Sequence, residues 1–217
     1  MVSTEADALA WARTGAPGGA VVAAGHQLAP RGRDGRLWNP GEGDVCFSMV
    51  LRPDPGGRIY VAAGCGLADA LGAGSEPAWP DEVWRGDARA GAVSAGAGGE
   101  WAVLSVLVAR PRQPAPQTIA AVVSAIEARL GADFAAVLDD YRRRCRTLGR
   151  PVRARLVPVG PAGREVTGRA VGVRSDGALV VERADGHRVA VRPDALGVLE
   201  DATETPTTPP PGMPGAS

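Results

Sequence analysis

The chain contains no lysine: all 24 of its basic residues are arginine, and 24 acidic residues balance them. The formal net charge is zero, which argues against a nucleic acid or another polyanionic partner. No stretch approaches the ~20 apolar residues of a membrane-spanning helix, and the N-terminus lacks the basic and then apolar pattern of a signal peptide. We therefore expect a soluble cytoplasmic protein without a membrane partner.

Cysteine and histidine are also scarce. The three cysteines, Cys46, Cys65 and Cys145, lie far apart, and no CxxC or His/Cys spacing is present. This pattern predicts no metal site and favours buried free thiols in a reducing compartment. Cys65 could serve as a nucleophile, but no base is adjacent to it in sequence. Only His26 and His187 are available as histidines, so a catalytic histidine is disfavoured.

The most distinctive segment spans residues 27–38 and follows a short apolar run. Three arginines alternate with two glycines: Arg31, Gly32, Arg33, Gly35 and Arg36. Glycine lets the backbone come close to a ligand, and arginine presents a planar charged fork that suits phosphate or carboxylate. A strand that leads into such a loop predicts an anion site, and a mononucleotide is the usual anion. A solvated basic loop is the alternative.

Periodicity predicts an α+β arrangement in the first two thirds of the chain. We expect helices over residues 4–13, 59–71, 118–131 and 134–141, with Thr4 and Thr118 as N-caps. We expect strands over residues 20–24, 45–52 and 101–108, and a weak strand within 91–99. Residues 110–117 hold three prolines and are expected to form a linker.

The period changes from helix to strand after residues 149–151. Four short strands are expected near residues 152–158, 166–174, 178–183 and 187–192, with Asp-Gly pairs as tight turns. A run of this kind predicts a small SH3-like β-barrel. We therefore divide the chain into a domain at 1–148, a barrel at 149–200, and a Pro/Thr/Gly-rich tail at 201–217 that is expected to be disordered.

The sequence of the arginine loop resembles the signature of biotin–protein ligases within the biotin/lipoate ligase family. It reads Gln-Leu-Ala-Pro-Arg-Gly-Arg-Asp-Gly-Arg-Leu-Trp. Three further segments resemble motifs of that family in the family's order: Ser3-Thr4, Phe47–Pro53 and Thr147–Val152. The resemblance covers roughly residues 2–200. It implies a mixed-sheet catalytic domain followed by an SH3-like β-barrel.

The resemblance also implies a reaction. The family uses ATP, with Mg, to activate biotin to an acyl-adenylate, and then transfers the acyl group to a lysine of a biotin carboxyl carrier domain. By their correspondence to the family's motifs, Thr4, Gln27, Arg31 and Gly91 are the implied biotin-binding residues. By the same correspondence, the implied nucleotide-binding residues are Gly32, Arg33, Gly35, Arg36 and Trp38. The resemblance does not decide whether the protein is a monomer or a homodimer. No DNA-binding helix-turn-helix is expected before Met1.

The motifs that carry the chemistry depart from the family pattern. Alanine replaces the family's lysines at Ala78 and Ala88, and the other departures are Glu5, Pro30, Asp81 and Ala109. We favour a non-catalytic homologue that keeps a ligand- or carrier-binding surface. The alternative is an active ligase with a drifted site, in which Arg89 supplies the missing cation. Arg89 is one position after Ala88, where the family has its lysine. On a regular strand this shift of one residue turns the Arg89 side chain to the opposite face.

Overall fold

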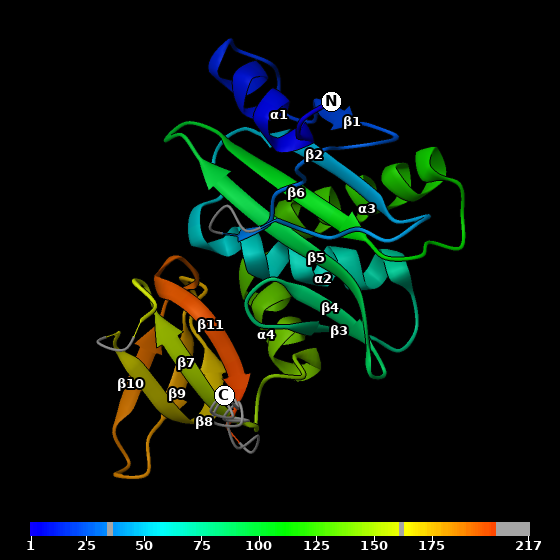
Figure 1. The fold of residues 1–217 in the computed structure, drawn as a ribbon. Coiled ribbons are helices and arrows are strands. Elements are labelled where there is room, and N and C mark those ends of the chain that lie inside the picture. Colours follow the sequence, from blue (N-terminus) through cyan, green and yellow to red (C-terminus); the bar gives the residue numbers. More distant parts are fainter. Residues whose placement is uncertain (34–36, 161–162, 203–217) are drawn as a thin grey trace, which may run out of the picture.

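The computed structural model describes residues 1–33, 37–160 and 163–202. Two sheets dominate the described chain (Figure 1). The first sheet has six strands in the order β1-β2-β6-β5-β4-β3. Its strands are β1 (Val21–Ala23), β2 (Val45–Leu51), β3 (Ser75–Ala78), β4 (Glu82–Arg85), β5 (Ala88–Ala97) and β6 (Ala102–Val108). Within the described residues no helix has both the length and the apolar character needed to cross a membrane.

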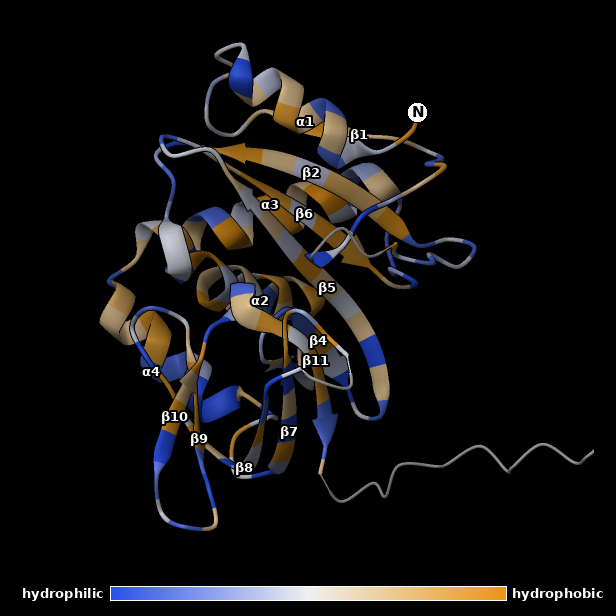
Figure 2. Cartoon of the chain, turned by 60° about the vertical axis from the view of Figure 1, so that its left-hand side comes forward, coloured by the Kyte–Doolittle hydropathy of each residue, from blue (hydrophilic) through white to orange (hydrophobic). Residues whose placement is uncertain are grey.

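Helices cover the two faces of this sheet unequally. α2 (Ile59–Leu71) and α3 (Ala115–Gly131) pack on one face, where Phe47, Met49 and Leu104 are fully buried. α1 (Thr4–Arg13) packs on the other face, over β1, β2 and β6. The central strands β2 and β6 are mostly apolar because both of their faces are covered in this way (Figure 2).

The second sheet has five strands in the order β10-β9-β8-β7-β11. They are β7 (Pro151–Leu156), β8 (Glu165–Val173), β9 (Leu179–Glu182), β10 (Arg188–Val191) and β11 (Leu196–Asp201). α4 (Phe134–Arg144) lies between the sheets, and its buried face shares one apolar cluster with the second sheet. The predicted fold class, an α+β domain followed by an SH3-like domain, is confirmed.

Backbone contacts and hydrogen bonds fix the two sheets against one another. Gly57 and Gly177 meet so closely that a Cβ added to either would overlap backbone atoms of the facing turn. The indole Nε1 of Trp79 donates to the Gly177 carbonyl at 2.8 Å. Arg142 on α4 donates from Nε to the Val173 carbonyl at 2.9 Å. The cleft between the sheets therefore has fixed walls.

Several details differ from the sequence-based expectations. Every neighbouring pair among the described strands is antiparallel, where a mixed sheet was expected, because hairpins and helical crossovers return the chain in alternating directions. The expected weak strand within 91–99 is the ten-residue strand β5. The pattern also missed β3, β4 and β11, which are short and lack regular alternation.

Two predicted N-caps are wrong. Ser3 is the N-cap residue of α1, and Thr4 is its first helical residue. α3 begins at Ala115 after the N-cap Pro114, and Thr118 donates its hydroxyl hydrogen to the Gln113 carbonyl. Proline is well suited to the first turn of a helix, so the helix starts inside the expected linker. The expected tail from 201 onward lies outside the described residues except for positions 201–202.

Candidate functional site

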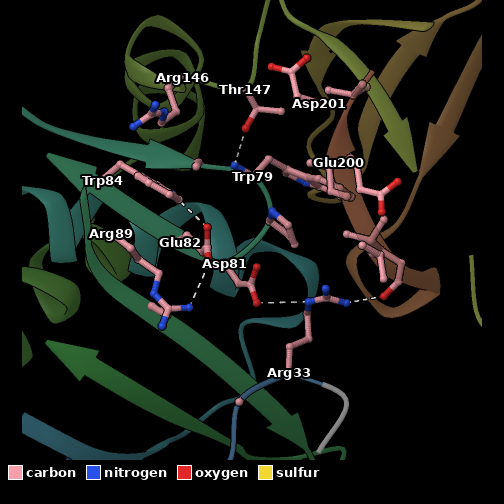
Figure 3. Close-up of a pocket in the computed structure, with 18 of the residues that line it drawn as sticks. Arg33, Trp79, Asp81, Glu82, Trp84, Arg89, Arg146, Thr147, Glu200 and Asp201 are labelled. Atoms are coloured by element: carbon pink, nitrogen blue, oxygen red, sulfur yellow. Dashed lines mark hydrogen bonds and ion pairs between the residues drawn. The ribbon is translucent and has the colours of Figure 1, made fainter. Parts of the chain in front are cut away.

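A cavity of about 500 Å³ lies between the β3–β5 half of the first sheet and strands β7 and β11 of the second (Figure 3). Its charged lining comprises four arginines, Arg33, Arg89, Arg146 and Arg150, and four carboxylates, Asp81, Glu82, Glu200 and Asp201. The signs balance. Electrostatic attraction for an anion therefore depends on which guanidinium groups are already paired.

Arg33 is held deep in this cavity and is only 9% exposed. Its Nε lies 3.2 Å from the Asp81 carboxylate (Figure 3). Its Nη1 donates to the carbonyl of Pro193 at 3.2 Å and also to the carbonyl of Leu196. The arginine loop is thus attached both to the β3–β4 turn and to the second sheet. A bound phosphate would have to replace or join these neutralising contacts at Arg33.

Trp38 forms an apolar floor beside the loop. A Cβ on Gly32 would overlap the Trp38 indole, so only glycine allows this ring to lie against the backbone. The indole also packs against Cys46, Ala92 and Leu107. A flat aromatic surface of this kind suits the ring of a nucleotide base.

Arg89 reaches the cavity because β5 is irregular. Val83 pairs with Gly91 whereas Trp84 pairs with Arg89, so Ala90 forms a β-bulge. The bulge reverses the alternation of faces, and Arg89 lines the cavity together with Ala92. The expectation that Arg89 turns to the opposite face is therefore wrong. Its Nη1 lies 3.2 Å from the Glu82 carboxylate (Figure 3).

The positions at which the family has lysine carry no cation here. Ala78 lines the cavity with its methyl group and is 9% exposed. Ala88 is exposed at the start of β5 and does not belong to the cavity lining. Arg146 instead stacks on Trp84, with its guanidinium carbon 4.7 Å from the ring centroid, and donates to the Gly86 carbonyl at 2.7 Å.

A second polar centre lies on the α1 side of the sheet. The Thr4 hydroxyl is 2.9 Å from the Ser48 hydroxyl, which is 2.8 Å from that of Ser105. Gln27 accepts the Thr4 backbone N–H at 2.7 Å through its Oε1. The hydroxyl oxygen of Ser3 is buried and has no hydrogen-bond partner among the described residues. This unpaired group is a candidate contact for a polar ligand.

The structure separates the two sets of residues that the resemblance implies. Of the nucleotide set, Gly32, Arg33 and Trp38 line the cavity, while Gly35 and Arg36 lie outside the described residues. Of the biotin set, Thr4 and Gln27 belong to the polar centre.

The remaining two biotin-set residues lie in different places. Arg31 bridges to Leu37 across the arginine loop and attracts the Glu5 carboxylate. Gly91 faces α2 instead: a Cβ there would lie 2.9 Å from the Leu67 side chain and 2.8 Å from the Leu107 carbonyl. Close packing of a helix on the sheet explains this glycine.

The sequence pattern missed the serines of the polar centre. Ser48 and Ser105 are directly opposite one another in the β2–β6 register, and Ser105 is opposite Ser94 in the β6–β5 register. Each serine interrupts an otherwise apolar strand, and three such interruptions at one level of the sheet are the signal that identifies them. Burial makes each hydroxyl costly unless it finds a partner.

Other candidate chemistry is absent from the residues that the structure describes. Burial raises the pKa of the Cys65 thiol to about 12, and that of Cys46 to about 12 with a further contribution from Asp44. Neither is a nucleophilic thiolate near neutral pH. Across residues 1–33, 37–160 and 163–202, no group of three or more His, Cys, Asp or Glu side chains could hold a metal ion.

Comparison with known proteins identifies the class. The family model described as "Biotin protein ligase C terminal domain" matches residues 147–194. Over 91 residues, 37% of this chain, the sequence is 40% identical to the biotin–[acetyl-CoA-carboxylase] ligase of Paracoccus denitrificans. Over 92 residues, 38% of this chain, it is 34% identical to the bifunctional ligase/repressor BirA of Bacillus subtilis. The matches span only 38% and 28% of these two relatives.

Solved structures match over more of the chain. The biotin protein ligase of Aquifex aeolicus in complex with biotin and ATP superposes with a TM-score of 0.75 at 17% identity, covering 93% of this chain and 96% of that chain. The biotin acetyl coenzyme A carboxylase synthetase of Helicobacter pylori superposes with a TM-score of 0.64 at 16% identity, covering 88% and 95%.

These likenesses define a protein with the biotin protein ligase fold, an antiparallel α+β domain that carries a small C-terminal β domain. The matching C-terminal family model and the sequence identity to curated ligases add evidence that is independent of the fold. The chain is similar to biotin protein ligases in the sequence of its C-terminal part and in its fold.

Proposed function

We propose that this protein is a biotin protein ligase-like protein that binds the ligand or carrier of the family and has impaired catalysis. The family chemistry is ATP-dependent activation of biotin to an acyl-adenylate, followed by transfer to a lysine of a carrier domain. The supporting observation is that two arginines near the expected reaction centre are already neutralised: Arg33 by Asp81 and Arg89 by Glu82.

The physical argument concerns charge. Activation brings a carboxylate and a triphosphate together, so fixed cations must face both groups. A guanidinium that is paired with a carboxylate offers a reduced field to a further anion, and Asp81 and Glu82 themselves repel it. Loss of one such cation costs several kcal/mol of transition-state stabilisation, a rate factor of about a hundred or more. Ala78 and Ala88 provide no replacement.

Ligand recognition has better support than catalysis. The Trp38 floor beside Gly32 would accept the nucleotide base, and the unpaired Ser3 hydroxyl with Thr4 and Gln27 would face the ring of biotin. ATP would enter with its magnesium ion as a substrate. The partner would be a biotin carboxyl carrier domain. Residues 1–148 would form the ligand-binding domain, and 149–200 the C-terminal domain that supports Arg33 through carbonyl groups.

Two measurements test this proposal. Isothermal titration with biotin, ATP and a non-hydrolysable biotinyl-adenylate analogue should show that the analogue binds. Incubation with a carrier domain, biotin, ATP and magnesium, followed by mass spectrometry, should show little or no transfer, with an active ligase as the control. Transfer within about tenfold of that control would contradict the impairment, since one tenfold step is only about 1.4 kcal/mol.

One observation favours the alternative of an active ligase with a drifted site. The bulge at Ala90 brings Arg89 into the cavity, where a cation is needed. If an anionic substrate displaced the Glu82 carboxylate, Arg89 would supply that charge. This alternative predicts measurable transfer that falls in the Arg89→Gln variant.

A further inference from the structure

A separate cavity of about 200 Å³ lies on the helix-covered face of the first sheet. The C-terminal end of α2, the N-terminal turn of α3 and the end of β6 enclose it, and it shares no lining residue with the cavity described above. Its charged lining consists of Arg85, Arg110 and Arg112. No carboxylate belongs to that lining. This cavity is therefore electrostatically unlike the charge-balanced one.

Arg85 has a donor that its structural contacts leave unused. Its Nη2 donates to the Ser75 hydroxyl at 3.2 Å and to the carbonyl of Leu71, the last residue of α2. Its Nε is buried and has no hydrogen-bond partner within the described chain. A buried guanidinium nitrogen without an acceptor is costly, so an acceptor supplied from outside the chain would be stabilised there.

Arg110 and Arg112 project from the loop that follows β6, and both are exposed. The Arg110 backbone has a φ of 44°, and its N–H donates to Oδ1 of Asp44 at 2.9 Å. The other oxygen of Asp44 accepts the Gly41 N–H at 2.8 Å. Asp44 thus positions the backbone of the loop, and its carboxylate forms no ion pair with either arginine side chain.

None of these three guanidinium groups forms an ion pair with a carboxylate in the described part of the chain. Arg33 and Arg89, in the first cavity, both do. Three uncompensated positive charges around so small a volume repel one another, and the site becomes favourable when an anion occupies it. The side chain of Gln113 adds amide donors, and Val108 and Val122 form the apolar wall behind them.

We propose that this cavity is a binding site for a tetrahedral oxyanion, namely a phosphate group, either free or at the end of a small organic molecule. A phosphate carries more charge than a carboxylate and accepts hydrogen bonds in several directions, which suits donors converging from β4 and the β6–α3 loop. The volume admits the phosphate group and leaves any organic remainder toward solvent. The site is independent of the ligase reaction.

The test is isothermal titration of the full chain with inorganic phosphate and with phenyl phosphate, and with nitrate at equal ionic strength as the anion control. The Arg110→Gln/Arg112→Gln variant alters exposed side chains and should remain folded. We expect phosphate binding by the natural sequence and a loss of affinity of about tenfold or more in this variant, because charge-assisted hydrogen bonds are removed. The Arg174→Gln/Arg188→Gln variant removes the same charge from the second sheet and should bind as the natural sequence does.

Stronger binding of phenyl phosphate than of inorganic phosphate would assign the site to an organic phosphate, and the reverse would assign it to free phosphate. Either result supports the proposal if the affinity for the phosphate compound is lower in the Arg110→Gln/Arg112→Gln variant. Absence of phosphate binding, equal binding of nitrate, or equal loss in both double variants would overturn it. The Arg85→Gln variant provides a second measurement: if it folds, it should weaken phosphate binding as well. Binding of the biotinyl-adenylate analogue should be unchanged in the Arg110/Arg112 variant, which separates this site from the proposed function.

Discussion

The Nε of Arg33 lies 3.2 Å from the carboxylate of Asp81, and this ion pair connects the arginine loop to the β3–β4 turn. The same guanidinium donates to the carbonyl groups of Pro193, in the 3-10 turn before β11, and of Leu196, the first residue of β11. One side chain therefore joins three segments that are far apart in sequence. Charge that the family resemblance assigns to a phosphate is used here to hold the cleft together.

Replacement of Arg33 by glutamine should lower the stability of the whole chain. The carbonyls of Pro193 and Leu196 would lose a charged donor, and Asp81 would lose its counter-ion, at a cost of about 1–3 kcal/mol. Thermal unfolding followed by circular dichroism measures this loss, with Arg183→Gln on an exposed turn as the control. Equal midpoints for the two variants would show that the Arg33 contacts do not contribute to stability.

Replacement of Asp81 by asparagine should improve binding of an anionic ligand. The amide can still accept a hydrogen bond from Arg33 but no longer repels a phosphate, and no carboxylate then compensates the guanidinium charge that faces the ligand. We expect about tenfold tighter binding of the biotinyl-adenylate analogue in isothermal titration. Glu42→Asn, a change at an exposed carboxylate away from the cavity, should leave the affinity unaltered. A decrease in affinity would mean that Asp81 serves the ligand directly.

The position that matters for transfer should be 89 rather than 88. The bulge directs Arg89 into the cavity, whereas Ala88 is exposed outside it. Ala88→Lys should therefore restore biotin transfer only slightly. If the unmodified chain transfers biotin at all, Arg89→Gln should reduce the rate by about a hundredfold or more, since it removes the cation at the developing charge. A large gain from Ala88→Lys would show that the strand changes register when the ligand binds.

The difference between positions 88 and 89 shows how far the sequence could determine the site. Periodicity located the helices and the central strands, because these elements are long and their apolar faces repeat. A single extra residue in β5 has no signature in a run of Ala, Gly and Ser, so the face of Arg89 could not be predicted. The contacts of Arg33 with residues 193 and 196 depend on how the two sheets meet, which local pattern does not encode.

The contact between Gly57 and Gly177 should be essential for the packing of the two sheets. A methyl group on Gly57 would overlap the carbonyl oxygen of Asp176, which is backbone and cannot move aside alone. Gly57→Ala should therefore destabilise the chain by about 1–3 kcal/mol, as overpacking does. Gly131→Ala is the matched control, since nothing lies within 4 Å of its added methyl group. Chemical denaturation of both variants measures the difference, and equal midpoints would show that the sheets can separate at this contact without cost.

The stability contributed by Glu5 should depend on pH in a defined direction. Burial raises the pKa of this carboxyl above its ordinary value of 4.5, and attraction to Arg31 opposes the shift only in part. The folded chain therefore holds the proton more tightly than the unfolded chain. The contribution of Glu5 is most favourable below the unfolded pKa and is lost as the pH rises through the raised pKa of the folded state. At pH 7 the charged form is destabilising.

Glu5→Gln should then raise the unfolding midpoint at pH 7 by a few degrees, corresponding to up to about 1 kcal/mol for a half-buried group, and the gain should vanish near pH 4. Glu42→Gln, at an exposed carboxyl, should show no such gain at either pH. A gain from Glu5→Gln that persists unchanged at pH 4 would mean that the glutamine packs better, and that desolvation of the Glu5 charge is not the cause.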